Sequence, residues 1–265
     1  MNEPDAAEAA YSVPPVHRAF ALLRHIAGGG RCRNVNQTAK SLGINRTTMI
    51  RLLHTLEAEG MIERIEEDAG WRLGPGMIVL AADALKSRDV VRVSRPIMAR
   101  LAASLSLSSH LGVLDGREII YLARETPDSH LVSNIREGSR LPAHGTTVGR
   151  VLLSHLPPER LRALYAGAEL AAYSDRTATS LEALERQLAE DRARGVAWSV
   201  SNYERGLGSC AAPVHDHRGR VVAAINVTGP AEAFEPGAPR AEEIEAAVKA
   251  GAEEASAALG WRRGA

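Results

Sequence analysis

The sequence predicts an α+β chain in two parts: a small helical part with one β-hairpin, then a larger part built on an antiparallel sheet. Three observations support this prediction. Apolar residues recur at helical spacing up to Leu56, two β-hairpin patterns occur further along the chain, and helical segments lie between those hairpins. The 265 residues, 45% hydrophobic and 24% charged, are sufficient to bury a core without disulfides.

The first part is assigned to residues 13–74, after a tail at 1–12 that we expect to be disordered. Its first helix is predicted at Pro15–Ala27, because apolar residues repeat there every three or four positions and a triple glycine follows. The residues expected to face the core are Val16, Ala19, Phe20, Leu23 and Ile26.

Two further helices are predicted from their N-caps, followed by a β-hairpin. Asn36 is expected to cap a helix over Asn36–Leu42, and Asn45 to cap the next helix, Arg46–Glu59. The segment MIERIEEDAGWRLG then predicts two strands with a turn at Asp68–Gly70. Two helices joined by a short turn containing glycine, with a hairpin after them, form a winged helix-turn-helix.

The charges are unevenly distributed, although Lys+Arg and Asp+Glu each number 32. No acidic residue occurs from Val13 to Leu56, a span that covers the three predicted helices except the last three residues of the third. Such a basic segment is typical of a surface that contacts phosphates, so zero net charge does not exclude a nucleic-acid partner. The segment contains seven fixed positive charges, Arg18, Arg24, Arg31, Arg33, Lys40, Arg46 and Arg51.

The second part, residues 90–262, follows a predicted connecting helix, Pro75–Arg88, in a linker at 75–89. Two apolar runs meet at Asp115-Gly116, and two more at a turn near Asp216–Gly219, so each pair predicts a hairpin. An antiparallel sheet flanked by helices is therefore expected. Helices are predicted at 90–105, 146–155, 158–165, 181–194 and 241–259.

Motifs for catalysis or metal binding are not found in the sequence. Residues 206–211, GLGSCA, match G-x-G-x-x-A but lead into a predicted strand, whereas a dinucleotide site requires a helix there. Cys32 and Cys210 form no CxxC pair, and no apolar run is long enough to span a membrane. We expect a cytoplasmic protein that is not an enzyme and has no cofactor or metal.

Read together, the two parts resemble the IclR family of transcriptional regulators. The resemblance covers about residues 14–232 and is carried by VHRAFALLRHIAGGG, VNQTAKSLGINRTTMIRLLHTLEAEGMIER, VLDGREIIYLAR, GSRLPAHGTTVGRVLLS and GRVVAAINVTGP. It implies a GAF-like effector-binding domain after the winged helix. It also implies that the protein binds double-stranded operator DNA and assembles as homodimers or dimers of dimers. The implied effector is a small organic acid, a class that includes aromatic acids.

The resemblance places the second and third helices on DNA. In the recognition helix it implies contacts with the major groove, where arginine can bind guanine through two hydrogen bonds. In the preceding helix it implies phosphate contacts that set the register. The acidic wing tip leaves Arg64 or Arg72 as the expected wing contact. The recognition residues are Arg46, Thr47, Thr48 and Arg51, and the phosphate contacts are Asn36, Gln37, Thr38 and Lys40.

The resemblance also implies an effector pocket between a helix start and two later strands. Backbone N–H groups at that helix start could bind a carboxylate. No Arg or Lys occupies a matched pocket position. The sequence differs from common members of the family at Ser209 and at Ser199–Asn202, which leaves the identity of the effector open. The implied pocket residues are Gly145, Thr146, Thr147, Val148, Leu207, Ser209, Asn226 and Thr228.

An alternative from another class stays open. The chain could be a GAF-like metabolite sensor or enzyme whose N-terminal helices dock a protein. A salt titration of duplex DNA binding distinguishes the two, because only a DNA-binding surface releases counterions from phosphates.

Overall fold

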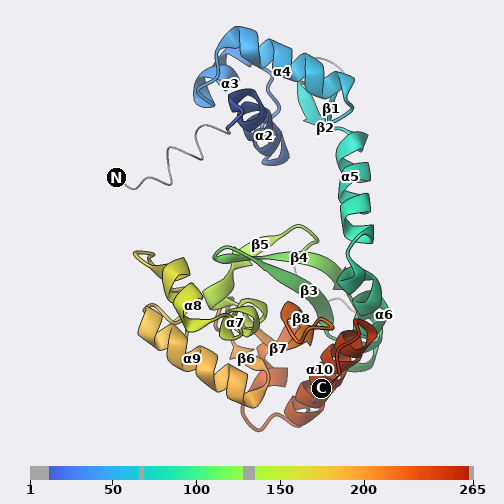
Figure 1. Cartoon of the computed structure of the whole chain (residues 1–265), viewed down its shortest axis with the longest axis vertical. Coiled ribbons are helices and arrows are strands. Elements are labelled where there is room, and N and C mark those ends of the chain that lie inside the picture. Colours follow the sequence, from blue (N-terminus) through green and yellow to red (C-terminus); the bar gives the residue numbers. More distant parts are fainter. Residues whose placement is uncertain (1–11, 66–68, 128–134, 263–265) are drawn as a thin grey trace. The chain divides into compact units, whose positions relative to one another are not determined.

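The computed structural model describes residues 12–65, 69–127 and 135–262. The expected tail, apart from Ser12, and the turn residue Asp68 lie outside these residues. The chain divides into two compact units, one up to Leu85 and one from Lys86 (Figure 1). In the described part no helix is both long and apolar enough to cross a membrane.

The first unit is a three-helix core with a two-stranded antiparallel hairpin, as the winged helix-turn-helix pattern predicts. Leu22 of α2, Ala39 of α3 and Met49 of α4 bring the three helices together around one apolar cluster, which also includes Ile62 of the hairpin. The elements are α2 (Pro14–Ala27), α3 (Val35–Ser41), α4 (Arg46–Ala58), β1 (Ile62–Arg64), β2 (Trp71–Leu73) and α5 (Pro75–Lys86).

Two details of this unit differ from the sequence expectations. The cap of α3 is Asn34, whose extended backbone lets its side chain accept a hydrogen bond from the Gln37 amide at 3.1 Å, so the prediction of Asn36 was wrong. Val16 and Phe20 were expected in the core but are 49% and 52% exposed. Their helix buries only its second half, where Leu22, Leu23 and Ile26 join the apolar cluster, so the apolar stripe is longer than its buried part.

The second unit is built on one six-stranded antiparallel sheet with the strand order β5-β4-β3-β8-β7-β6. Both predicted hairpins, β3–β4 and β7–β8, are confirmed, and they meet side by side at the centre. The sequence analysis did not predict the two edge strands. The strands are β3 (Ser108–Asp115), β4 (Glu118–Glu125), β5 (Arg140–Pro142), β6 (Ala197–Val200), β7 (Leu207–His215) and β8 (Val221–Pro230).

Helices cover both faces of this sheet (Figure 1). The helices α6 and α10 pack together on one face, and α7 with α9 lies on the other, over a core that includes Val148, Leu153 and Leu184. The elements are α6 (Asp89–Leu105), η1 (Ala143–Gly145), α7 (Thr147–Ser154), α8 (Pro158–Tyr165), α9 (Leu181–Arg194), η2 (Ala231–Phe234) and α10 (Ala241–Ala258).

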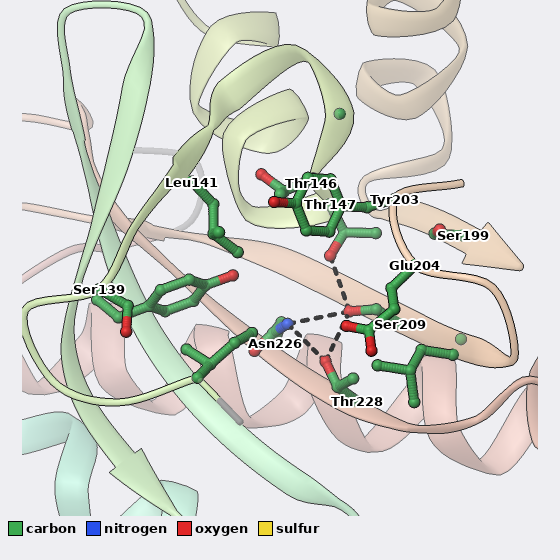
Figure 2. A pocket seen from close by; sticks show the side chains of 15 residues that line it. Ser139, Leu141, Thr146, Thr147, Ser199, Tyr203, Glu204, Ser209, Asn226 and Thr228 are labelled. Atoms are coloured by element: carbon green, nitrogen blue, oxygen red, sulfur yellow. Dashed lines mark hydrogen bonds between the residues drawn. The ribbon is translucent and has the colours of Figure 1, made fainter. Parts of the chain in front are cut away.

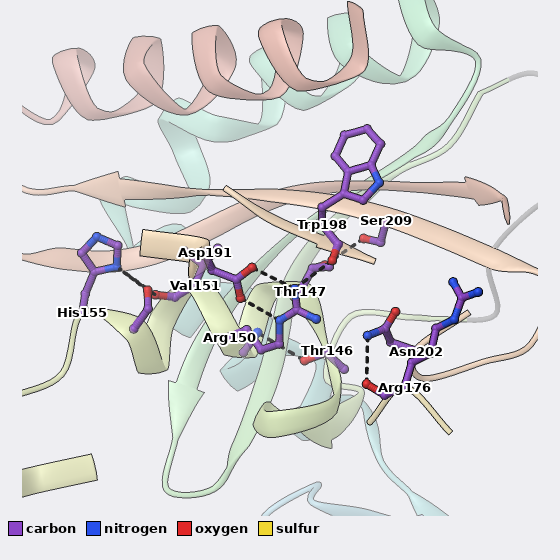
Figure 3. Close-up of polar contacts among 12 residues, drawn as sticks. Thr146, Thr147, Arg150, Val151, His155, Arg176, Asp191, Trp198, Asn202 and Ser209 are labelled. Carbon is purple, nitrogen blue, oxygen red and sulfur yellow. Dashed lines mark hydrogen bonds and ion pairs between the residues drawn. The ribbon is translucent and has the colours of Figure 1, made fainter. Parts of the chain in front are cut away.

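A buried ion pair fixes α7 above the sheet. Arg150 Nε lies 2.8 Å from Asp191 Oδ2 and its Nη2 lies 3.0 Å from Oδ1, while Nη2 also donates to the Trp198 carbonyl at 2.8 Å (Figure 3). The guanidinium therefore joins α7 to α9 and to β6. Because both partners are buried, this arrangement constrains α7 more strongly than surface pairs could.

Candidate functional site

A cavity of about 280 Å³ opens between the start of α7 and the central strands of the second unit. Seven of the eight residues that the resemblance implied line it: Gly145, Thr146, Thr147, Leu207, Ser209, Asn226 and Thr228. The eighth, Val148, is fully buried and is not a lining residue. It packs beside Gly112, where a Cβ would lie only 2.7 Å from Val148 Cγ1.

The wall of the cavity is the N-terminus of α7. Thr146 caps the helix in an extended conformation, and its Oγ1 accepts from the Gly149 amide at 3.2 Å. Gly149 is needed there because a Cβ would lie 2.1 Å from the Ala143 carbonyl oxygen of η1. The amides of Thr147 and Val148 come first in the helix, where no intrahelical acceptor exists, and the helix dipole favours an anion beside them.

The floor of the cavity is a network of hydroxyl and amide groups (Figure 2). Ser209 Oγ lies 2.8 Å from Thr147 Oγ1 and 3.2 Å from Thr228 Oγ1, and it donates to the Val227 carbonyl at 3.0 Å. Asn226 Nδ2 donates to Ser209 Oγ at 2.9 Å and to Thr228 Oγ1 at 3.0 Å. Three elements, α7, β7 and β8, thus contribute polar groups to one floor.

The sequence analysis missed the groups that complete the lining. Tyr121 of β4 is buried, and burial raises the pKa of its phenol, so it is a neutral hydroxyl near pH 7. Tyr203 and Glu204 come from the loop between β6 and β7, for which no periodic pattern exists. None of the described lining residues is Arg or Lys. The remaining missed residues are Ile135, Ser139, Leu141, Ser199 and Gly208.

The exposed face of α4 is the second candidate site. Arg46, Thr47 and Arg51 are exposed, as the recognition-helix expectation requires, while Thr48 is half-buried and its amide donates to the capping Asn45 side chain at 2.8 Å. Ile50 lies on the same face, three residues after Thr47, and is 46% exposed. An exposed apolar side chain there suits contact with a thymine methyl group, and the sequence analysis did not select it.

The residues of α3 that were expected to contact phosphates differ in their exposure to solvent. Asn36, Gln37 and Lys40 are exposed, but Thr38 is only 8% exposed, which argues against a phosphate contact at that position. The helical turn directs Thr38 toward Cys32 in the interior of the unit.

The wing arginines are occupied by acidic partners. Arg64 Nε lies 3.0 Å from Glu57 and its guanidinium stacks over Trp71, while Arg72 Nε lies 2.6 Å from Glu63. These ion pairs weaken the expectation that Arg64 or Arg72 contacts DNA. Arg31 and Arg33 lie beside the wing and are exposed. The Arg31 carbonyl accepts a hydrogen bond from the Trp71 amide at 2.8 Å, and Arg33 Nε donates to the Ala69 carbonyl at 3.4 Å.

Among the described residues, no three or more His, Cys, Asp or Glu side chains come together in a group that could hold a metal ion. Cys32 and Cys210 are free and buried, and burial raises the pKa of both thiols. Both cysteines are therefore protonated packing residues near neutral pH.

Comparison with known families matches most of the chain. Residues 82–257 match the model described as bacterial transcriptional regulator IclR C-terminal, and residues 15–66 match the IclR helix-turn-helix domain. The HTH-type transcriptional regulator XynR of Escherichia coli K12 is 30% identical, covering 82% of this chain and 86% of that protein. The glycerol operon regulatory protein of Streptomyces coelicolor is 34% identical, covering 84% and 87%.

Solved structures share the fold over nearly the whole chain. An IclR transcriptional regulator from Alicyclobacillus acidocaldarius superimposes with a TM-score of 0.81 at 26% identity, covering 94% of this chain and 100% of that one. An IclR homologue from Microbacterium hydrocarbonoxydans, complexed with 4-hydroxybenzoate, has a TM-score of 0.78 at 23% identity, with coverages of 92% and 98%. The Escherichia, Streptomyces and Alicyclobacillus relatives are all named as regulators, in agreement with the expectation that this chain is not an enzyme.

Proposed function

Since this chain belongs to the IclR family of bacterial transcriptional regulators, we propose that α3 and α4 bind operator DNA and that a small organic acid in the second unit modulates this binding. The observation that supports it best is the exposed start of α4, where Arg46, Thr47 and Arg51 are available to the major groove and no acidic residue precedes Glu57. A protein-docking role gives no reason for the seven fixed positive charges between Val13 and Leu56, where no acidic residue occurs.

The effector part of the proposal is supported by the cavity. The first amides of α7 are suited to a carboxylate, and the Thr147, Ser209 and Thr228 hydroxyls can surround it. We infer that this unit is a GAF-like effector-binding domain. Binding at the cavity would need to change operator affinity by only 1–3 kcal/mol, which is about the usual coupling between two sites.

We further propose that copies of this chain assemble in the cytoplasm as homodimers or dimers of dimers. Apolar side chains on α2 and α5 of the first unit support this proposal. Ile78, Val79 and Leu80 of α5 are all exposed in a single chain, as are Val16 and Phe20 of α2. An exposed apolar set of this kind is typical of a protein interface.

DNA binding by the first unit is expected to depend steeply on salt. The logarithm of the association constant for a short duplex should fall linearly with the logarithm of the salt concentration, with a slope of about 0.9 for each phosphate contacted. Lys40→Gln should lower that slope by about 1, since Lys40 is exposed on α3. Fluorescence anisotropy over a salt series measures the slope.

A matched control is Lys249→Gln in the second unit, where Lys249 pairs with Glu245 on α10. It should leave the slope unchanged. A wild-type protein that binds no duplex at any salt concentration would contradict the proposal and favour the docking alternative.

An organic acid that occupies the cavity should raise the melting temperature. At 100 times its dissociation constant a ligand stabilises the folded state by about 2.7 kcal/mol, which thermal shift detects. The panel should include 4-hydroxybenzoate, because a fold neighbour holds it. Ser209→Ala removes the shared hydroxyl of the floor and should reduce the shift, whereas Ser104→Ala on α6 should not. Equal shifts in both variants would place the acid elsewhere.

A further inference from the structure

The polar floor of the cavity continues to His110, a residue that does not line the cavity. His110 on β3 stands directly opposite Asn226 on β8, so both side chains project from the same face of the sheet. His110 Nδ1 lies 3.0 Å from Asn226 Oδ1, and the imidazole is fully buried with its ring edge-on to Tyr121. Tyr121 and Asn226 both line the cavity, and His110 lies behind them.

The contact with Asn226 determines the protonation state of His110. An amide oxygen only accepts hydrogen bonds, so the proton must be on Nδ1. The other ring nitrogen, Nε2, is buried without a partner among the described residues, and a proton there would be an unsatisfied donor. Burial lowers the pKa of His110 to about 4, so the ring is neutral at pH 7.

His110 in turn orients the Asn226 amide. With Oδ1 engaged by His110, the NH₂ group points to the floor and donates to Ser209 Oγ and Thr228 Oγ1 at 2.9 and 3.0 Å. A reversed amide would place its oxygen over these hydroxyls. They would then donate to Asn226 instead of accepting from it.

The hydroxyl hydrogens of the floor follow from this orientation. Ser209 donates to the Val227 carbonyl and can accept two hydrogen bonds, one of which comes from Asn226. Thr228 Oγ1 donates to Ser209 Oγ at 3.2 Å and takes the second lone pair, so Ser209 cannot also accept from Thr147 Oγ1, which lies 2.8 Å away. The hydroxyl hydrogen of Thr147 is then free to point into the cavity.

We propose that His110 is a positioning residue for ligand recognition, because its hold on Asn226 leaves the Thr147 hydroxyl as a donor to an accepting oxygen of the ligand. This inference rests on the proposed effector cavity. It makes the cavity floor selective for a carboxylate or carbonyl oxygen over a hydrogen-bond donor at the same position. The residue acts through Asn226 and does not touch the ligand.

The tautomer can be measured without any ligand. NMR of the full chain labelled with ¹⁵N-histidine distinguishes the neutral Nδ1–H form, the neutral Nε2–H form and the imidazolium, and the His110→Leu spectrum assigns the signal. We expect the Nδ1–H form for His110 at both pH 7 and pH 5.5, where exposed histidines become protonated. An Nε2–H tautomer, or an imidazolium at pH 5.5, would overturn the proposal.

The consequence for recognition is tested with 4-hydroxybenzoate as the probe. His110→Leu removes the donor and should weaken binding about tenfold, the effect of losing one charge-assisted hydrogen bond. His110→Asn can still donate to Asn226 and should restore most of the affinity. The matched control is His155→Leu at the end of α7, which should change nothing.

The outcomes separate the two proposals. Equal affinity in wild type and His110→Leu would overturn the role of His110 while leaving the effector cavity in place. If the wild type binds no acid of the panel, the proposed effector class fails, and the NMR result still supports or overturns the positioning of Asn226 by His110.

Discussion

Replacing Arg46 and Arg51 together with alanine is expected to remove sequence-specific DNA binding and to leave the fold intact. Both side chains are exposed on α4, so their loss opens no cavity and leaves no buried group unpaired. A bidentate contact between arginine and guanine discriminates by about 1–3 kcal/mol, so the pair should contribute about 2–6 kcal/mol, or at least thirtyfold in affinity.

The measurement is the dissociation constant for the operator by anisotropy, with the melting temperature as a check on folding. Arg162→Ala combined with Arg218→Ala removes the same charge from exposed positions of the second unit and serves as the control. An operator affinity unchanged in the Arg46/Arg51 variant would show that α4 is not the recognition helix.

Replacing Arg150 with leucine is expected to destabilise the second unit by about 3–5 kcal/mol. The guanidinium is 3% exposed and binds both oxygens of Asp191. Without it, a buried carboxylate loses its partner, and burial already raises the pKa of Asp191. The Trp198 carbonyl loses its hydrogen-bond donor in the same variant. Urea denaturation followed by circular dichroism measures the loss.

Two further variants make this test specific. Arg194→Leu breaks an ion pair with Glu245, but Arg194 is 48% exposed, so it should cost no more than about 1 kcal/mol. Arg150→Leu with Asp191→Leu removes both charges and should recover much of the stability. A loss below about 1 kcal/mol in Arg150→Leu alone would contradict the importance assigned to this pair.

The Arg150 pair also bears on the proposed function, because α7 supplies one wall of the cavity. Thr146 and Thr147 lie one turn before Arg150 on the same short helix. A helix of this length has few contacts of its own to fix its direction, so the ion pair with α9 and the tight approach of Gly149 to η1 hold the wall in place. Ligand affinity should therefore fall together with stability in Arg150→Leu.

The sequence by itself determined the fold class and most element boundaries, because these depend on local patterns. Apolar spacing located α2, the cap Asn45 located the start of α4, and the turns at Asp115-Gly116 and near Asp216–Gly219 located both central hairpins. Local pattern was insufficient at the start of α3, where Asn34 and Asn36 are both suitable N-cap residues. The extended backbone of Asn34 makes it the cap. Local pattern also placed Phe20 in the core, because spacing identifies an apolar face without identifying what covers it.

Only the tertiary structure decided which side chains act together. Seven of the eight implied cavity residues are brought to one cavity. Tyr121 reaches the same cavity from β4, and Tyr203 and Glu204 reach it from a loop that has no periodic pattern. His110 became significant only because the β3–β8 register sets it against Asn226. The physical reason is that local spacing fixes the face on which a side chain lies, whereas strand pairing and helix packing fix its neighbours.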